Sequence, residues 1–119
     1  MRTVQVGHMS HLALFYPWRP AQDADSGQMV NAWTADGETR CGVAFTPQGA
    51  VLEGTEGTVI ANYKIRLPLG MAGRAETLCR YEIIEAFGEL LAQPWMLEQV
   101  GPAAPGPSGL LIYARRVAT

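Results

Sequence analysis

The two histidines are the first candidates for chemistry, because imidazole both binds metals and transfers protons near neutral pH. His8 and His11 lie three residues apart, a spacing that a helix would place on one side. No Asp, Glu or Cys lies near them in the sequence to complete a set of metal ligands. We therefore expect two surface histidines and predict no metal site.

Nucleophilic catalysis would need a Cys or Ser beside one of these histidines and a third group to orient the base. Distance along the sequence leaves such a pairing open, but no G-x-S-x-G elbow occurs. Ser108 lies between Pro107 and Gly109, which favours a hydrogen-bonding residue of a turn over a nucleophile.

Three glutamates, Glu82, Glu85 and Glu89, are the candidates for acid–base chemistry. In a strand, Glu82 and Glu85 fall on opposite faces, which would prevent a shared site. Solvated or interfacial glutamates are the better interpretation. The sequence thus predicts no catalytic residue and no cofactor, and we expect a protein that is not an enzyme.

Phosphate-binding signatures are absent from the sequence. Neither G-x-x-x-x-G-K-[ST] nor G-x-G-x-x-G occurs, and the prolines within Gly101–Gly109 remove backbone N–H donors that a phosphate loop needs. The formal charge is −2, from nine basic and eleven acidic residues. This balance disfavours general affinity for DNA, although it leaves open a local basic ring in an oligomer.

The two cysteines, Cys41 and Cys79, have apolar neighbours inside predicted strands, so we expect buried, reduced thiols. The first residues, MRTVQVGHMS, lack the apolar core of a secretory signal, and no apolar run approaches the roughly 20 residues of a membrane span. We expect a soluble, cytosolic protein. Trp33 and Trp95 are expected to anchor a core or an interface.

The composition predicts one small all-β domain. A chain of 119 residues is long enough for one core, and its 13 glycines and 8 prolines cluster between apolar runs. We expect a small antiparallel β-barrel or sandwich with long loops and at most one short helix.

The first half of the chain divides into an arm and the start of the barrel domain. Residues 1–20 are expected to form an N-terminal arm, and residues 21–119 a single β-barrel domain. Pro17 and Pro20 indicate that His11–Trp18 is an edge strand or extended arm. Met29–Pro47 is predicted to be a hairpin around Asp36-Gly37, with Pro47 ending its second strand.

Two glycine-containing segments flank the clearest strand of the sequence. Gln48–Gly57 is predicted to be an exposed loop or a flexible hairpin tip, and Leu69–Glu76 a second loop. Between them, Thr58–Pro68 alternates as a half-buried strand. Lys64 and Arg66 should lie on its wetter face, and its apolar face consists of Val59, Ala61, Tyr63, Ile65 and Leu67.

In the last third of the sequence we predict strands on both sides of a Pro/Gly-rich segment. Leu78–Phe87 favours a strand, with a helix over Arg74–Leu91 as a rival because good helix formers are frequent there. Val100–Gly109 is predicted to be a rigid Pro/Gly corner before a closing strand. That strand should place Leu110, Ile112 and Ala114 on one face and Leu111, Tyr113 and Arg115 on the other.

Three segments in this order resemble a known family. They are TVIANYKIRLPLG (Thr58–Gly70), RYEIIEAFGELL (Arg80–Leu91) and EQVGPAAPGPSGLL (Glu98–Leu111). Together they are similar to the head-closure proteins of tailed bacteriophages, also called head–tail connector or stopper proteins. The resemblance covers about half of the chain. Cys79-Arg80 departs from it, since an Asp-Arg pair often stands there in such proteins.

The resemblance implies a structural protein of the virion neck, assembled in the host cytoplasm. Such a protein forms a ring of six or twelve copies between the portal or adaptor proteins and a tail-terminator or tail protein, and it helps to retain the packaged DNA. The alternative is a small OB-like or SH3-like β-barrel module that contacts nucleic acid. The lack of a basic excess argues against that alternative.

Apolar residues in the predicted loops are the candidate contacts with partner subunits. They lie in segments whose glycines would let the backbone reshape on docking, and they have no obvious core to join. The N-terminal arm adds one aromatic side chain. The predicted interface residues are Val51, Leu52, Leu69, Met71 and Trp18.

Overall fold

The computed structural model describes residues 9–22, 25–54 and 57–117, and among them residues 21, 47–54 and 57–60 by their backbone only. Within these ranges the chain forms eight strands and one short turn of 3-10 helix. In chain order they are β1 (His11–Tyr16), β2 (Trp18–Gln22), β3 (Met29–Trp33), β4 (Glu38–Gly54), β5 (Gly57–Leu67), η1 (Leu69–Met71), β6 (Arg80–Ala86), β7 (Glu89–Gly106) and β8 (Gly109–Val117).

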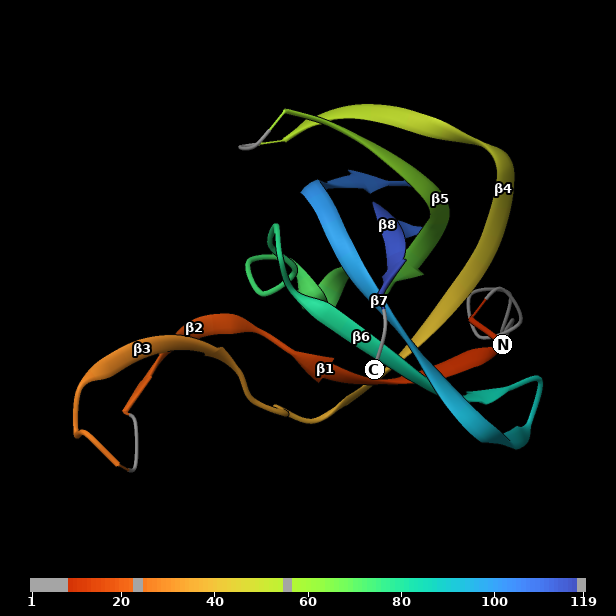
Figure 1. Cartoon of the computed structure of the whole chain (residues 1–119). Helices are drawn as coiled ribbons and strands as arrows, with labels where there is room; N and C mark the ends of the chain where they lie inside the picture. Colours follow the sequence, from red (N-terminus) through yellow and green to blue (C-terminus); the bar gives the residue numbers. More distant parts are fainter. Residues whose placement is uncertain (1–8, 23–24, 55–56, 118–119) are drawn as a thin grey trace.

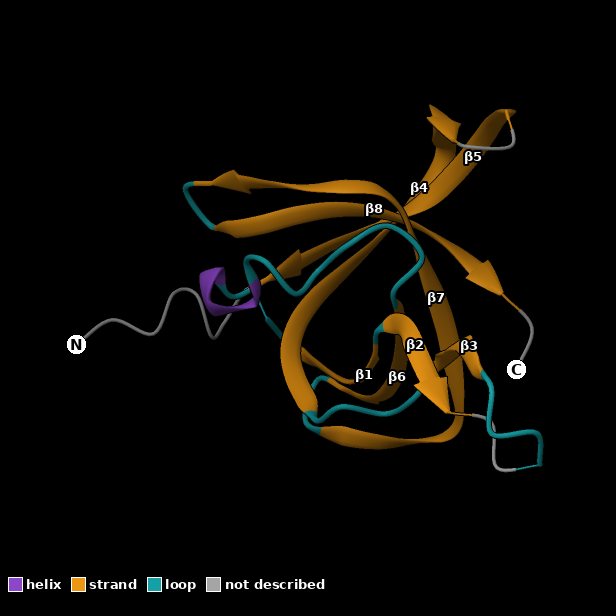
Figure 2. Cartoon of the chain, turned by 90° about the vertical axis from the view of Figure 1, so that its left-hand side faces the viewer, coloured by secondary structure: helices purple, strands orange, loops and turns teal. Residues whose placement is uncertain are grey.

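Six antiparallel strands close into a ring in the order β1-β4-β5-β8-β7-β6, and β2 and β3 form a separate two-stranded hairpin. The all-β prediction is therefore confirmed. The ring is not an even barrel, because the β4–β5 and β7–β8 hairpins leave it in different directions (Figure 2). The β2–β3 hairpin projects from one side of the ring, away from β4 and β5 (Figure 1).

Strand β1 is a full member of the ring, so its prediction as an edge strand or extended arm was wrong. It pairs with β4 on one side and with β6 on the other, and its residues alternate between buried and half-buried. The prolines allow this because Pro17 follows the last residue of β1 and removes no hydrogen bond from its ladders. Pro20 lies in β2, outside the ring.

The predicted hairpin over Met29–Pro47 is also wrong. β3 pairs with β2, whereas β4 pairs with β1 and β5. Asp36 and Gly37 do not reverse the chain. They run beside Phe15, whose backbone donates to the Gly37 carbonyl and accepts from Asp36 N–H. β1 and β2 therefore form the outward limb, and β3 and β4 the return limb, of one long bent hairpin.

Strand β4 continues through Pro47, which was expected to end it. A register shift between Phe45 and Ala50 interrupts the pairing with β5 around the proline, and the ladder then resumes as far as Gly54 and Gly57. Such an irregularity is where a strand can accommodate a residue without an N–H. Of the two interpretations offered for Gln48–Gly57, the hairpin end is the correct one.

Strand β6 settles the choice between strand and helix in favour of the strand. It ends in a tight two-residue turn, because Ala86 pairs with Glu89 across Phe87 and Gly88. Both turn residues have positive φ, 54° at Phe87 and 84° at Gly88. Two consecutive positive φ angles are typical of a type I′ turn, whose twist suits a hairpin.

The predicted Pro/Gly corner over Val100–Gly109 is instead the end of a long strand. β7 runs to Gly106 through a register shift between Val100 and Ala104, and the chain reverses only at Pro107 and Ser108. Ser108 is thus a turn residue, as expected. Gly109 has φ +117°, and a Cβ there would collide with the Leu67 carbonyl, so only glycine fits.

Inward-facing residues of every ring strand build one core, and the predicted register is right. Ile65, Leu67, Ile112 and Ala114 are buried, whereas Lys64 and Arg66 are half-exposed on the outer face. Tyr63 is only half-buried and packs at the margin of the core. The buried cluster comprises Ala13, Phe15, Cys41, Ile65, Leu67, Met71, Ala75, Cys79, Tyr81, Ile83, Leu97, Leu110, Ile112 and Ala114.

Both cysteines are free and buried, as predicted. Burial raises the pKa of the Cys41 thiol to about 12, because the core disfavours the thiolate.

One fully buried amide, the side chain of Gln99, links the ring to the segment after η1. Its Oε1 accepts from the Tyr81 hydroxyl at 2.9 Å. Its Nε2 donates to the carbonyls of Ala75 at 3.3 Å and Gly101 at 2.9 Å. These three bonds join β7, which carries both Gln99 and Gly101, to β6 and to the segment after η1, and so constrain their relative positions.

The register of β5 leads to a direct test. Replacing Ile65 by Ala should lower the free energy of unfolding by about 2–5 kcal/mol, because it opens a cavity in the core. Replacing the neighbouring Lys64 by Ala should cost less than about 0.5 kcal/mol, as is usual for outward residues. Urea denaturation of the two variants measures both values, and equal losses would contradict the register.

Candidate functional site

The predicted interface residues are spread over three parts of the molecule. Trp18 is half-buried in β2, and Leu69 is 54% exposed at the start of η1. The backbones of Val51 and Leu52 pair with Ile60 and Val59 in the β4–β5 hairpin, and their side chains lie outside the described residues. The structure therefore does not bring these residues together into one patch.

Met71 does have a core to join, contrary to expectation. The η1 turn is closed by hydrogen bonds from Met71 N–H to the Pro68 carbonyl and from Ala75 N–H to the Met71 carbonyl. These bonds fold the segment back over the ring, where Met71 is only 6% exposed. The second predicted loop is thus attached to the barrel through Met71 and Ala75.

His11 is buried, so its prediction as a surface residue was wrong. It lies on the inward face of β1 with Ala13 and Phe15, and its ring meets the Phe87 ring edge-on at 5.1 Å. Burial lowers the pKa of His11, because the charged imidazolium is poorly solvated there. His8 lies outside the described residues.

Glu82 and Glu85 share the outer face of the sheet, which corrects the expectation of opposite faces. A register shift between Ile83 and Glu85 places Glu82 opposite Leu14 and Glu85 opposite Leu12, and those leucines lie on one face of β1. The two carboxylates bind different side chains. Glu82 accepts a 3.0 Å hydrogen bond from Tyr16, and Glu85 pairs with Arg40 at 3.0 Å.

No cluster of three or more potential metal-ligating side chains occurs within the described part of the chain. Nor does this part contain a helix long and apolar enough to cross a membrane.

The base of the β2–β3 hairpin is attached to the ring by a stack of three side chains. The Trp18 and Trp33 ring centres lie 4.2 Å apart, and the Arg80 guanidinium lies 3.5 Å from the centre of the Trp33 ring. Trp33 Nε1 also donates to the Leu78 carbonyl at 2.8 Å. Cation–π contact and this hydrogen bond together orient the hairpin.

Arg80 is itself held by a buried carboxylate. Glu98 is 4% exposed, and it pairs with Arg80 at 3.2 Å and with Arg115 at 2.7 Å. Two arginines thus compensate one desolvated charge. A second ionic cluster lies nearby, where Asp36 pairs with Arg19 at 2.9 Å and with Arg74 at 3.2 Å.

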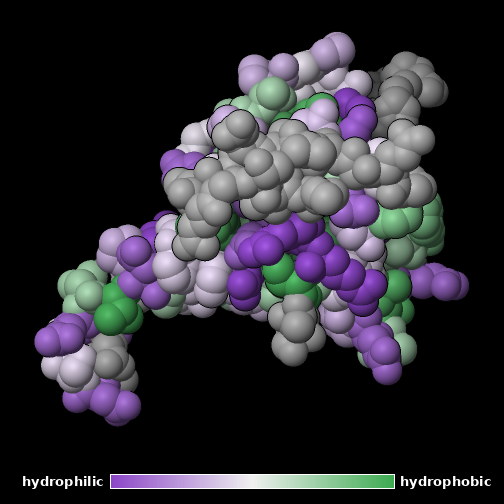
Figure 3. Space-filling model, turned by 45° about the horizontal axis from the view of Figure 1, so that its top comes forward, coloured by the Kyte–Doolittle hydropathy of each residue, from purple (hydrophilic) through white to green (hydrophobic). Residues whose placement is uncertain are grey.

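Beyond this base, the hairpin carries exposed apolar side chains. Met29 is 65% exposed and Val30 44% exposed. The space-filling view shows the hairpin as a narrow projection on which apolar and polar surfaces lie side by side (Figure 3). Its sequence between the two strands includes Asp23 and Asp25.

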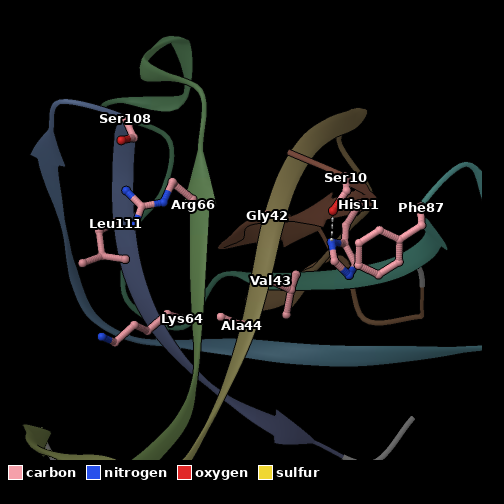
Figure 4. Close-up of a pocket in the computed structure, with 10 residues that line it drawn as sticks. All are labelled: Ser10, His11, Gly42, Val43, Ala44, Lys64, Arg66, Phe87, Ser108 and Leu111. Atoms are coloured by element: carbon pink, nitrogen blue, oxygen red, sulfur yellow. Dashed lines mark hydrogen bonds between the residues drawn. The ribbon is translucent and has the colours of Figure 1, made fainter. Parts of the chain in front are cut away.

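A hollow of about 470 Å³ lies between the start of β1, the β6–β7 turn and the β4–β5–β8 wall. Figure 4 shows its two sides facing one another across β4. One side is formed by Ser10, His11 and Phe87, and the other by Lys64, Arg66 and Leu111.

The hollow exists because β4 has small outward residues just where β1 leaves it. The described ladder between β1 and β4 ends at the His11–Cys41 pair. Ser10 turns away instead, and its carbonyl accepts a 2.7 Å hydrogen bond from Phe87 N–H. Gly42 and Ala44 face outward beside Arg66 and Lys64, and they fill little of the resulting space.

Searches for related proteins found no family model that matches the chain and no significant match among curated proteins.

The stack at the base of the hairpin predicts the effect of Arg80→Met. This change removes the contact with Trp33 and one of the two cations at Glu98. We expect a loss of about 1–3 kcal/mol in the free energy of unfolding, the cost of removing a hydrogen bond to a buried charge, and faster proteolysis within β2–β3.

The matched control is Arg116→Met. Arg116 also lies over a tryptophan, at 5.4 Å from the Trp95 ring, but makes no ion pair with any described residue. Urea denaturation and limited proteolysis of both variants measure the difference. Equal behaviour would show that Arg80 does not hold the hairpin.

The lowered pKa of His11 predicts a pH dependence of stability. The unfolded chain binds a proton at His11 near pH 6.5, whereas the folded chain binds it only at lower pH. Protons therefore favour unfolding, and stability should fall as the pH drops from 7.5 to 5.5. His11→Gln should lose less stability over this interval, as measured by urea midpoints. An equal loss would show that His11 does not contribute.

Proposed function

We propose that this chain is a structural head-closure protein of a tailed-phage neck. In this role it is one subunit of a ring between the portal or adaptor proteins and the tail, and it helps to retain packaged DNA. The function requires specific contacts with protein neighbours on several sides and no catalytic site.

The observation that carries the proposal is the presence of exposed apolar side chains on several parts of the ring and its hairpins. Met29 and Val30 lie on the β2–β3 hairpin, Phe87 (77% exposed) lies in the tight turn between β6 and β7, and Leu90 (78% exposed) follows that turn. Phe45 on β4 and Leu69 in η1 are also exposed, at 58% and 54%. The β2–β3 hairpin and the β6–β7 turn project from the body of the ring (Figure 1). Exposed apolar groups on projecting elements favour burial against other subunits.

The fold also gathers the segments on which the resemblance rests. The first of them forms β5, the second forms β6 with its turn, and the third forms the β7–β8 hairpin. These strands are consecutive neighbours in the ring order β5-β8-β7-β6. The resemblance therefore covers one continuous wall of the barrel, as expected if it reflects a shared scaffold.

The local charges support protein contacts over a general nucleic-acid surface. Ion pairs with carboxylates involve most of the basic side chains in the described residues: Arg19, Arg40, Arg74, Arg80 and Arg115. A surface that binds phosphate backbones needs cations that are free to do so.

Assembly of particles with and without the protein tests the proposal. Heads assembled without it should lose their DNA and carry no tails, and adding the purified protein should restore filled, tailed particles in electron micrographs. A normal yield of filled, tailed particles in its absence would rule out the proposed function.

The β4–β5 hairpin offers a more specific prediction. Replacing Leu52–Val59 by Asn-Gly keeps the Val51–Ile60 pair and closes it with a favourable two-residue turn. The core should remain folded by circular dichroism, since it lies in the ring, while the yield of filled, tailed particles should fall strongly. Glu56→Gln, which keeps the hairpin length, is the control. Normal particles from the shortened variant would show that this hairpin makes no essential contact.

A further inference from the structure

Leu78 has a backbone conformation that leucine rarely adopts. Its φ is 78°, and it lies inside a turn that the Cys79 N–H closes on the Glu76 carbonyl at 3.1 Å. A positive φ at Leu78 but not at the preceding Thr77 is typical of a type II turn. Such turns favour glycine at this position, because a Cβ makes the left-handed conformation unfavourable. The turn is therefore strained, and contacts with its surroundings must maintain it.

Hydrogen bonds hold both peptide groups that flank the Leu78 Cα. Leu78 N–H donates to the Gln99 carbonyl on β7 at 3.1 Å. The Leu78 carbonyl accepts from Trp33 Nε1 on β3 at 2.8 Å. While both bonds are in place, φ cannot change without breaking one of them. One bond belongs to the barrel wall, and the other belongs to the β2–β3 hairpin.

The turn ends a strap, defined here as residues 69–79, which contacts the hairpin limb and also lines an apolar groove. Toward the hairpin, Arg74 donates to the Asp36 carbonyl and pairs with its carboxylate, both at 3.2 Å. The groove has a volume of about 370 Å³, and strap residues such as Ala75 line it together with Ala103 and its neighbours on β7. The strap is thus attached to the hairpin limb and forms part of the groove wall.

We infer that the strap is a strained link through which the position of the β2–β3 hairpin controls the groove. With Trp33 in place, Leu78 keeps its positive φ. When the hairpin moves away, the Leu78 carbonyl is released, and the turn relaxes to a negative φ by rotation of the Thr77–Leu78 peptide. This rotation breaks the bond to Gln99 and loosens the strap at the groove wall. Because such coupling is reciprocal, a ligand that fixes the strap also fixes the hairpin.

This coupling is a property of the single chain, and it goes beyond the proposed function. It also differs from simple attachment of the hairpin to the ring. If Trp33 only attached the hairpin, its release would free the hairpin and leave the strap unchanged. A strained link instead transmits the release to residues that Trp33 does not touch.

Alkylation of the native cysteines tests the link. Trp33→Phe removes the indole N–H and keeps an aromatic ring in the stack at the base of the hairpin. Cys79 is 2% exposed, and its Sγ donates to the Arg74 carbonyl within the strap. In Trp33→Phe, iodoacetamide should modify Cys79 about fivefold faster or more, because one hydrogen bond fewer opposes opening of the strap. Cys41, 0% exposed inside the ring, should keep its wild-type rate, as measured by mass spectrometry.

Amide hydrogen exchange measured by NMR gives a second readout at the groove wall. The amides of Leu78 and Ala75 both donate hydrogen bonds within the folded chain. Both should exchange faster in Trp33→Phe, whereas the amides of Ile65 and Ile112, a pair in the ring, should be unchanged. Equal acceleration at all four positions would indicate a general loss of stability and would overturn the inference.

Relief of the strain separates a strained link from a simple attachment. Leu78→Gly lets the turn keep its positive φ without the bond from Trp33. In this background, Trp33→Phe should change the alkylation rate of Cys79 by less than about twofold, since the two changes act on one element. The matched control is Phe87→Asn, which eases the other positive φ of a non-glycine residue in the described ranges. In that background, Trp33→Phe should keep its full effect.

Leu78→Gly by itself provides a test that does not depend on the folding of Trp33→Phe. It should slow the alkylation of Cys79, because a turn without strain opens less often. Circular dichroism of each variant establishes that it is folded. An unchanged or faster rate in Leu78→Gly would overturn the inference. So would an unchanged rate in folded Trp33→Phe, or an equal acceleration by Trp33→Phe with and without Leu78→Gly.

Discussion

The fold depends on the hydrogen bonds of one fully buried polar side chain, Gln99, which is 0% exposed. Its amide bridges the Tyr81 hydroxyl on β6, the Ala75 carbonyl after η1 and the Gly101 carbonyl at the irregular part of β7. An unpaired amide at this depth would be strongly unfavourable, so these three segments are constrained together. Met71, whose carbonyl accepts from Ala75 N–H, belongs to the same buried cluster.

The hollow beside Lys64 and Arg66 results from the way β1 pairs with its two neighbours in the ring. This strand pairs on both sides but stays beside β4 only as far as Cys41. The backbone bond from Phe87 N–H to the Ser10 carbonyl then holds Ser10 beside the β6–β7 turn. A strand edge, two cations and apolar side chains are thereby exposed in one hollow. This surface arises because the described β1–β4 ladder ends at Cys41 while β4 continues.

The opposite side of the molecule is organised by charge and aromatic stacking. Glu98 is desolvated and requires two arginines, and one of them, Arg80, stacks on Trp33. The β2–β3 hairpin is therefore oriented by a group that the barrel wall already needs for its own stability. This coupling gives a narrow projection a defined direction, and a hairpin with a fixed direction loses less conformational entropy when it docks.

The sequence by itself determined the all-β class, the faces of β5 and β8, and the burial of Cys41 and Cys79, because alternation and apolar neighbours are local signals. Tertiary structure decided which strands pair. Pro17 and Pro47 are compatible with their strands because one follows the end of β1 and the other falls at a register shift. The faces of Glu82 and Glu85 depended on another such shift. The hollow was not predictable, since it joins residues from Ser10 to Leu111 through non-local pairing, which no local pattern encodes.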